Sequence, residues 1–370
     1  MTNIAIDCKN LALYSGGISA FFRPLLAAWL EHRPDVKFFL VGPQFDVSAL
    51  PKSGNWEKVN ISWPTWLPRP LRHPFYDIFL FPRALKRLSL KAVFSPYHDV
   101  RLPGPASGVR AAMIIHDTCI EDLPGIYPWR IRAYFLSMLR LNLTAAQLVL
   151  TVSAASRARI LSQYAIAPER VQVVYNTLDP LFSALVDENA VSALRASYKA
   201  GLLLFYAGGC EYRKNTGRLI EALSLLAANG HDPKLLITGV RDAGWNRVLG
   251  GAPTSLLERI HFLGRLDLRT LAAHYAAATV IACPTLCEGF GRLCLEAMAV
   301  GTPLACSDLA VLREVAGDYP VYFDPLDSAA IAAAIVKAGA RGRQTPFFDE
   351  RFSPASVKKS FLARMDAFLA

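Results

Sequence analysis

Short apolar runs alternate with amphipathic stretches along the whole chain. The runs are rich in Val, Ile, Leu and Ala, which is typical of buried parallel strands. The stretches between them repeat apolar positions at helical spacing, and two of them, Asn215–Asn229 and Phe290–Val300, are followed directly by a glycine. A glycine just beyond the last turn is an ordinary helix stop. This alternation predicts βαβ units on parallel sheets.

The chain is expected to fold as two doubly wound, Rossmann-like α/β domains, because equal numbers of strands are predicted before and after residue 180. We assign residues 1–180 to the first domain and 181–352 to the second, with a helix at 353–370 that packs back across the hinge. Ligands of such sheets bind beyond the carboxyl ends of the strands, so two facing domains would share one cleft. The predicted strands are Asn3–Asp7, Lys37–Val41, Ala92–Ser95, Ala111–Ile115, Leu148–Val152, Val171–Val174, Leu202–Ala207, Lys234–Thr238, Ile260–Leu263, Val280–Cys283, Leu304–Cys306 and Val321–Phe323.

Basic side chains outnumber acidic ones by 40 to 30, and the excess is uneven. Residues 1–180 hold 20 basic and 12 acidic side chains, whereas residues 181–370 hold 20 and 18. The first half is therefore expected to meet an anionic substrate or a polyanionic surface. Because the chain begins without a basic, apolar leader and contains no run of roughly 18 apolar residues, a cytoplasmic protein is expected.

The segment from Cys283 to Glu296 carries the most specific chemistry. A predicted strand ends at Cys283, a turn containing Glu288 follows, and a helix begins near Gly291. The free backbone N–H groups at the start of such a helix form an anion site. Carboxylates on either side of that site match the sugar and ribose hydroxyls of a nucleoside diphosphate sugar. Taken alone, two glutamates of this kind are more often solvated surface charges.

Two further motifs follow predicted strands. Arg213 and Lys214 come after Leu202–Ala207, where they could clamp a diphosphate and stabilise it as a leaving group. His116 ends another strand, where it could reach a ligand across the cleft with Asp117 orienting its ring. An exposed basic turn and a structural histidine are the simpler interpretations of each motif by itself.

A pair of glycines, Gly16 and Gly17, follows the first predicted strand and would let the backbone approach a phosphate. The chain has no G-x-G-x-x-G motif, which weakens a dinucleotide interpretation. It also has no Asp-x-Asp pair, so the sequence suggests no Mg²⁺ or Mn²⁺ site.

Together these motifs resemble those of the GT-B glycosyltransferases, specifically the large retaining family 4. They occur in the family's order over nearly the whole chain, from Gly16-Gly17 and His116-Asp117 through Arg213-Lys-Asn215 to Glu288-x7-Glu296. The most specific part is the tract Glu288-Gly-Phe-Gly, with Leu295-Glu-Ala-Met-Ala-Val-Gly-Thr-Pro303 behind it.

The resemblance implies a retaining hexosyltransferase that needs neither a metal ion nor a cofactor besides its nucleotide-sugar donor. Glu288 would contact the donor sugar, and Lys214 with Arg213 would stabilise the departing nucleoside diphosphate. His116 would contact the sugar near the reacting carbon. Attack from the face that the leaving group vacates would retain the anomeric configuration, so Glu288 is not assigned as a covalent nucleophile.

The resemblance also implies the residues that bind the donor. Glu296 would bind the ribose hydroxyls, and Gly16 and Gly17 would line the diphosphate from the first domain. Backbone groups near Val240 and Arg265 would select the base. The amides that would hold the sugar and the diphosphate belong to Phe290, Gly291, Arg292 and Leu293.

Mannosyl transfer is frequent in the Arg-Lys-Asn subgroup, so GDP-mannose is the expected donor and a surface polysaccharide or lipopolysaccharide the expected product. The sequence departs from the family at Gly209, where many members have arginine, and at Thr177, where the family's Asn-Gly pair has glycine. A GT-B sugar-nucleotide epimerase is disfavoured by the Glu288 tract. A non-catalytic nucleotide-sugar-binding protein is disfavoured by the intact site residues. No motif supports a nucleic-acid binder.

Residues 62–91 interleave aromatic and basic side chains, a mixture that suits the headgroups of an anionic membrane at about 1 kcal/mol per basic residue. Four prolines, the last of them Pro74, predict that the first part is a loop. We interpret the segment as a surface that docks on the inner leaflet and helps to receive a lipid-linked glycan acceptor. A core-packing segment with a basic outer edge fits the pattern equally well. The residues are Trp63, Trp66, Phe75, Tyr76, Phe79 and Phe81 with Arg69, Arg72, Arg83, Lys86, Arg87 and Lys91.

Overall fold

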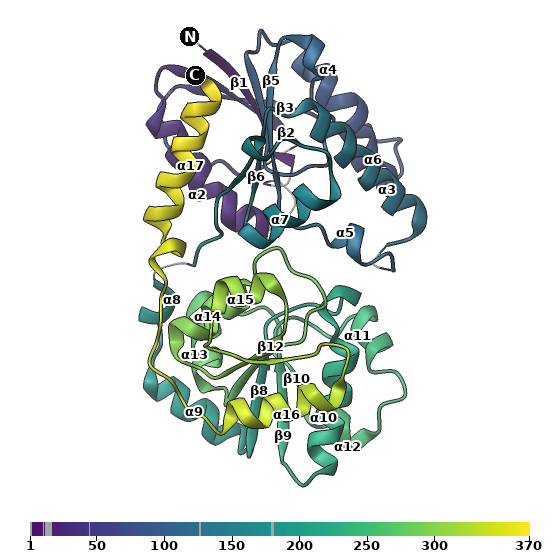
Figure 1. Cartoon of the computed structure of the whole chain (residues 1–370), viewed down its shortest axis with the longest axis vertical. Coiled ribbons are helices and arrows are strands. Elements are labelled where there is room, and N and C mark those ends of the chain that lie inside the picture. The colour runs from purple at the N-terminus through teal and green to yellow at the C-terminus, as the bar shows by residue number, and fades with distance from the viewer. Residues whose placement is uncertain (1, 10, 12–16, 44, 126, 179–180) are drawn as a thin grey trace. The chain divides into compact units, whose positions relative to one another are not determined.

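A computed structural model describes residues 2–9, 11, 17–43, 45–125, 127–178 and 181–370 (Figure 1). The chain forms two compact units. The first comprises Met1–Glu121, Tyr127–Asn176 and Ala355–Ala370, and the second comprises Asp122–Ile126 and Thr177–Pro354. Apart from the short stretch Asp122–Ile126, the chain enters the second unit after Asn176 and returns to the first for its last helix.

The first unit is built on a seven-stranded parallel sheet in the order β3-β2-β1-β4-β5-β6-β7. Its strands are β1 (Thr2–Asp7), β2 (Val36–Gly42), β3 (Trp56–Asn60), β4 (Ala92–Ser95), β5 (Arg110–Ile115), β6 (Leu148–Thr151) and β7 (Val171–Val173). Its helices include α2 (Gly17–His32), α3 (Arg69–Phe75), the π-helix η1 (Tyr76–Leu80), α4 (Phe81–Leu85), α5 (Cys119–Asp122), α6 (Trp129–Ala145), α7 (Ala154–Gln163) and α17 (Pro354–Leu369), with short 3₁₀ turns η2 (Pro105–Ser107) and η3 (Pro168–Arg170).

The second unit repeats the plan with a six-stranded sheet in the order β10-β9-β8-β11-β12-β13. Its strands are β8 (Leu202–Tyr206), β9 (Pro233–Ile237), β10 (Ile260–Phe262), β11 (Val280–Cys283), β12 (Leu304–Ser307) and β13 (Val321–Phe323). Its helices are α8 (Leu181–Ala184), α9 (Glu188–Tyr198), η4 (Tyr212–Lys214), α10 (Thr216–Ala228), α11 (Ala243–Val248), α12 (Thr254–Leu257), α13 (Leu268–Ala277), α14 (Arg292–Val300), α15 (Ala310–Ala316), α16 (Ser328–Gly339) and η5 (Glu350–Phe352).

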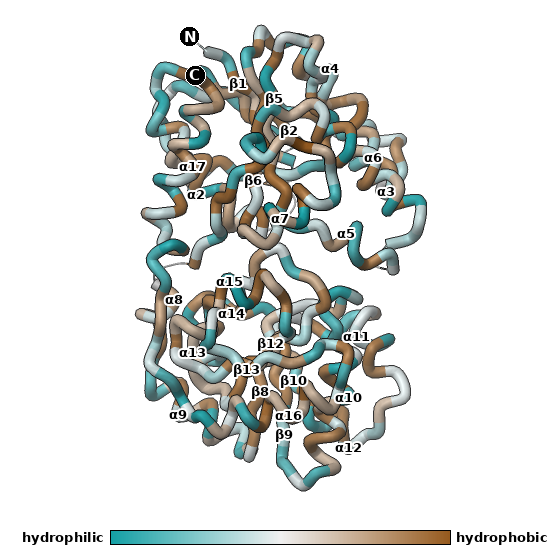
Figure 2. The backbone as a smooth tube through the Cα atoms, viewed as in Figure 1, coloured by the Kyte–Doolittle hydropathy of each residue, from teal (hydrophilic) through white to brown (hydrophobic). Residues whose placement is uncertain are grey.

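The strands are the hydrophobic centre of each unit (Figure 2). Every residue of β4, β6, β8, β11 and β12 is buried, which is why these strands read as continuous apolar runs instead of alternating ones. Within each sheet the order reverses beside the first strand, between β1 and β4 and between β8 and β11. Ligands of doubly wound sheets bind at this switch point, beyond the carboxyl ends of the two strands.

Two sequence expectations about local structure were wrong. β3 was not predicted, because Trp56-Glu-Lys-Val-Asn60 is an edge strand in which no residue is buried and the apolar signal is weak. Residues 69–75 form helix α3 and not a loop. Pro70 lies in the first turn, where a missing N–H costs nothing, and the chain continues from Pro74 into the π-helix η1.

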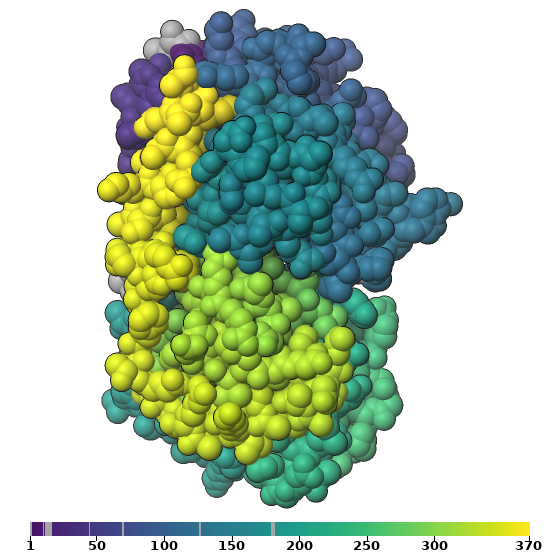
Figure 3. All heavy atoms as spheres, viewed as in Figure 1, coloured from purple at the N-terminus to yellow at the C-terminus, as the bar shows by residue number. Residues whose placement is uncertain are grey.

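Helix α17 packs on the first unit beside α2. The Phe361 ring contacts Phe22, Trp29 and Phe94 at centroid distances of 5.7–6.3 Å. At the surface the Asp366 carboxylate accepts a hydrogen bond of 2.8 Å from His32. Figure 3 shows this helix as the yellow ridge on the surface of the unit.

Candidate active site

The loops after β8 and β11 meet at the switch point of the second sheet and are joined by hydrogen bonds. Asn215 Nδ2 donates to the carbonyl oxygens of Pro284 and Pro325 at 2.9 and 2.7 Å. Thr285 Oγ1 donates to the carbonyl of Arg213 at 2.9 Å. The basic turn predicted from the sequence is therefore fastened to the loop that carries Glu288.

Asn215 shapes this turn, a role that the sequence analysis did not assign to it. Its φ of 56° is in the left-handed region, which asparagine tolerates better than most residues. This conformation ends η4 and starts α10, so it turns the chain sharply directly after Lys214. The signal in the sequence was its place in the Arg-Lys-Asn motif.

Glu288 and the two cations of the basic turn come together. Lys214 Nζ lies 2.5 Å from Glu288 Oε1, and an Arg213 guanidinium nitrogen lies 3.6 Å from Oε2. Burial alone would raise the pKa of Glu288, but the two neighbouring cations outweigh it and hold the pKa below its ordinary value. Glu288 is thus an ionised, half-enclosed carboxylate between two cations, and not a solvated loop residue.

Helix α14 begins at Arg292, four residues after Glu288 in the same loop. Gly291, directly before the helix, has a φ of 96°, a conformation that favours glycine. No described side chain caps α14, so the first backbone N–H groups, at Arg292 and Leu293, are available to an anion. The Phe290 side chain packs in the core against Phe352 at 5.3 Å, which leaves only its backbone for a ligand.

Glu296 lies inside α14 and is buried, so the interpretation as a helix-surface charge was wrong. Its carboxylate accepts a hydrogen bond of 2.5 Å from the Tyr275 hydroxyl and lies 3.4 Å from the Arg292 guanidinium. Burial raises its pKa above the ordinary value despite these partners. Tyr275 belongs to α13, and nothing in the sequence pattern indicated this partnership.

Val240 and Arg265 lie on neighbouring loops at the carboxyl ends of β9 and β10. The preceding glycines, Gly239 and Gly264, form an antiparallel bridge with reciprocal N–H to O=C bonds of 2.7 and 2.9 Å. Val240 is 68% exposed, so an apolar side chain stands open to solvent beside backbone groups, an arrangement that suits the face of a nucleobase.

His116 directly follows β5 in the first unit. Its Nε2 lies 2.9 Å from the carbonyl oxygen of Pro96. A carbonyl only accepts, so Nε2 carries the proton and Nδ1 is the acceptor nitrogen of the ring. Burial lowers the pKa of His116 from 6.5 to about 4, so the imidazole is neutral at physiological pH. Asp117 was expected to orient this ring, but its carboxylate instead accepts the backbone N–H of Cys119 at 3.0 Å.

Of the two glycines expected to line the diphosphate, Gly17 begins α2 and has open space at its Cβ position. Gly16 lies outside the described residues.

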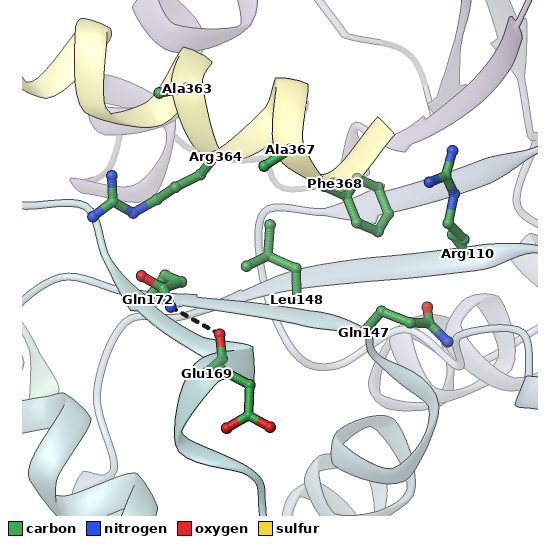
Figure 4. Close-up of a pocket in the computed structure, with 9 residues that line it drawn as sticks. All are labelled: Arg110, Gln147, Leu148, Glu169, Gln172, Ala363, Arg364, Ala367 and Phe368. Atoms are coloured by element: carbon green, nitrogen blue, oxygen red, sulfur yellow. Dashed lines mark hydrogen bonds between the residues drawn. The ribbon is translucent and has the colours of Figure 1, made fainter. Parts of the chain in front are cut away.

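A separate groove of about 620 Å³ lies in the first unit between α17 and the amino ends of β5 to β7 (Figure 4). Its lining includes Arg110, Leu148, Arg364 and Phe368, together with Gln172, which donates to the carbonyl of Glu169 at 2.8 Å. This is the sheet edge opposite His116, and the groove contains none of the residues that the sequence singled out.

Solved structures with similar folds are glycosyltransferases. A sucrose-phosphate synthase from Thermosynechococcus elongatus matches all of this chain and 95% of its own, with a TM-score of 0.71 at 19% identity. WaaG, a glycosyltransferase involved in lipopolysaccharide biosynthesis, matches 98% of this chain and 95% of its own, with a TM-score of 0.69 at 16% identity. Two parallel-sheet α/β units arranged along the chain in this way define the GT-B fold.

Two family models match the chain, Glycosyltransferase Family 4 over residues 15–181 and Glycosyl transferases group 1 over residues 201–340. The chain belongs to this family of GT-B glycosyltransferases. The O-antigen chain mannosyltransferase B of Escherichia coli is 31% identical over 65% of this chain and 64% of its own. The O-antigen chain mannosyltransferase RfbU of Salmonella typhimurium is 25% identical over 72% of this chain and 70% of its own.

Among the helices that the structure describes, none is both long enough and apolar enough to cross a bilayer.

Proposed function

We propose that this protein is a retaining, metal-independent hexosyltransferase that moves mannose from GDP-mannose to a glycan or lipid-linked acceptor of a surface polysaccharide or lipopolysaccharide. The single observation that carries the proposal is the cluster of Glu288, Lys214 and Arg213 beside the amino end of α14. Membership of the glycosyltransferase family and the two O-antigen mannosyltransferases among the relatives support the sugar and the product.

The donor fits this cluster by charge and by order. The diphosphate is placed at the helix amino end beside the two cations, which already lie together in this loop. The ribose lies toward Glu296, the base toward Val240 and Arg265, and the hexose toward Glu288. For His116 of the first unit, the proposed role is a contact to a sugar hydroxyl. When the diphosphate binds, Lys214 and Arg213 exchange part of their contact with Glu288 for contact with the phosphate oxygens.

Leaving-group stabilisation then needs no metal ion. Two cations and a helix amino end can neutralise the charge that develops on the departing nucleoside diphosphate. Glu288 is already paired with these cations, which makes it a hydrogen-bond acceptor for sugar hydroxyls and a poor covalent nucleophile. Attack on the face that the leaving group vacates retains the anomeric configuration.

The proposal is tested by incubating the protein with GDP-mannose and an O-antigen-type glycan acceptor in the presence of EDTA. The expected product is a mannoside of unchanged anomeric configuration by NMR, formed at the same rate with and without the chelator. An inverted product, or turnover that requires added Mg²⁺ or Mn²⁺, would contradict it.

We also propose that the first unit docks on an anionic membrane through the segment 62–91 and the start of α6. Trp66 and Phe79 are 73% and 57% exposed in the segment, and Trp129 is 73% exposed on α6. The two elements touch, because the Tyr134 hydroxyl of α6 bonds Asp77 of η1 at 2.8 Å. The same stretches of sequence carry exposed cations at Arg83, Lys86, Arg87, Lys91 and Arg130. Tyr76 and Phe81 of the same segment are buried, so the core-packing interpretation is correct for these two residues.

Flotation with vesicles that contain phosphatidylglycerol tests this surface. The protein should float at low salt, and the double variant Trp66→Ala/Phe79→Ala should bind several-fold less. Phe347→Ala, which removes a 52% exposed phenylalanine from the second unit, is the matched control and should float normally. Equal flotation of the two variants would show that this surface is not used.

A further inference from the structure

A buried ion cluster lies at the switch point of the first sheet, where β1 and β4 are neighbours. Lys9 follows β1 and is fully buried. Its ammonium binds the Asp77 carboxylate of η1 and lies 2.6 Å from Oδ2 of Asp99, in the loop after β4. One lysine therefore ties two loops to the end of the first strand.

The loop that holds Asp99 also holds the hydrogen-bond partner of His116. Pro96 accepts from His116 Nε2, and the Tyr97 ring stacks on the imidazole with 6.1 Å between centroids and 25° between planes. The His98 ring in turn lies 4.3 Å from Tyr97. Because Asp99 comes directly after these residues, fixing its carboxylate restrains the carbonyl that sets the tautomer of His116.

Asp99 is one of three carboxyl groups close to Lys9. The ammonium already has Asp77, and Asp7 lies close by, its carboxylate accepting the backbone N–H of Lys9 at 3.0 Å. Burial raises the pKa of Asp7 to about 6 and that of Asp77 to about 8, and the neighbouring Asp99 carboxylate contributes to both shifts. Oδ1 of Asp99 is also buried without a partner among the described residues. Such a group is costly, so a purely stabilising role explains Asp99 poorly.

We infer that the Lys9–Asp99 pair is a positioning device for His116. It holds the Pro96–Asp99 loop so that His116 keeps its proton on Nε2 and turns Nδ1 toward a ligand as an acceptor. That the ligand is a sugar hydroxyl rests on the proposed function, whereas the tautomer and its cause do not.

The test is ¹⁵N NMR of histidine-labelled protein over a pH range, with the His116 signals assigned by their loss in His116→Gln. The wild type should show the Nε2–H tautomer and a midpoint near 4. Asp99→Ala leaves Lys9 paired with Asp77, and it leaves Asp117 and His98, the other titratable groups facing His116, in place. It should raise the midpoint by at least one pH unit and mix the tautomers. Turnover should fall about tenfold at unchanged KM for the donor.

Asp99→Asn should keep most of the wild-type tautomer and midpoint, because its amide oxygen still accepts a hydrogen bond from Lys9. This variant replaces Asp99→Ala in the test if the alanine variant fails to fold. Asp77→Asn is the matched control. It changes the other partner of the Lys9 ammonium, which lies on η1, and His116 should titrate as in the wild type. Wild-type tautomer and midpoint in Asp99→Ala would overturn the inference, whatever happens to stability. If the wild-type protein and all of its variants failed to transfer sugar, the proposed function would be wrong. The NMR result would still decide this inference.

Discussion

At the scale of single residues, Glu288 and Lys214 carry the proposed chemistry. Lys214→Ala removes a cation from the leaving group and Glu288→Ala removes the contact to the sugar, so each should reduce transfer by about 10²–10³-fold. Both side chains are partly exposed, so the stability cost of losing the pair should stay within about 1 kcal/mol. Lys337→Ala, at an exposed position of α16, should keep full activity. Turnover close to wild type in either site variant would mean that the site lies elsewhere.

His116 gives the first unit a pH dependence of its own. The folded protein keeps this imidazole neutral to about pH 4, whereas the unfolded chain takes up the proton near pH 6.5. The unfolded state therefore binds more protons in this window, and the stability that His116 contributes is lost as pH falls from about 6.5 to about 4. Urea melts should show wild type losing about 2 kcal/mol more than His116→Gln over this range. Parallel pH profiles would contradict the assignment of a partly buried, neutral imidazole.

At the scale of elements, the start of α14 depends on one glycine. A Cβ at Gly291 would lie 2.5 Å from Leu312 Cδ2, and its φ of 96° disfavours any other residue. Gly291→Ala should therefore destabilise the protein by about 1–3 kcal/mol and weaken nucleotide binding. Gly217→Ala, in the first turn of α10 with open space at its Cβ, should stabilise slightly. Thermal melts of both variants check this, and a Gly291→Ala protein as stable as wild type would contradict the assigned backbone.

The sequence predicted elements well where burial makes the pattern strong. Each predicted strand overlaps an observed one, because strands buried on both faces are apolar throughout. It failed at β3, an edge strand with little to bury, and at α3, where the prolines obscured a short helix. It also misplaced the partner of His116, because Pro96 is a backbone acceptor on another strand end and leaves no side-chain signature.

At the scale of the whole molecule, the order of the motifs along the chain predicts the family. The sheet order explains why this was possible, since Arg213, Lys214 and Glu288 all follow the two strands that flank the switch point of the second sheet. The order of the motifs does not predict contacts between elements that are distant in the sequence. One example is the hydrogen bond from Tyr275 to Glu296, and another is the binding of Lys9 to both Asp77 and Asp99. These residues are far apart in the sequence, and no repeating pattern of residues indicates that they meet.

The central claim, that the second unit holds a guanosine diphosphate sugar through Glu296 and Lys214, is tested most directly by thermal unfolding with a panel of nucleotides. GDP and GDP-mannose at 100 times their Kd should stabilise the protein by about 2.7 kcal/mol and raise its Tm by several degrees, whereas UDP, dTDP and ADP should not. The shift should disappear in Glu296→Ala and in Lys214→Ala. Stabilisation by a different nucleotide family would overturn the donor, and stabilisation that survives both substitutions would overturn the site.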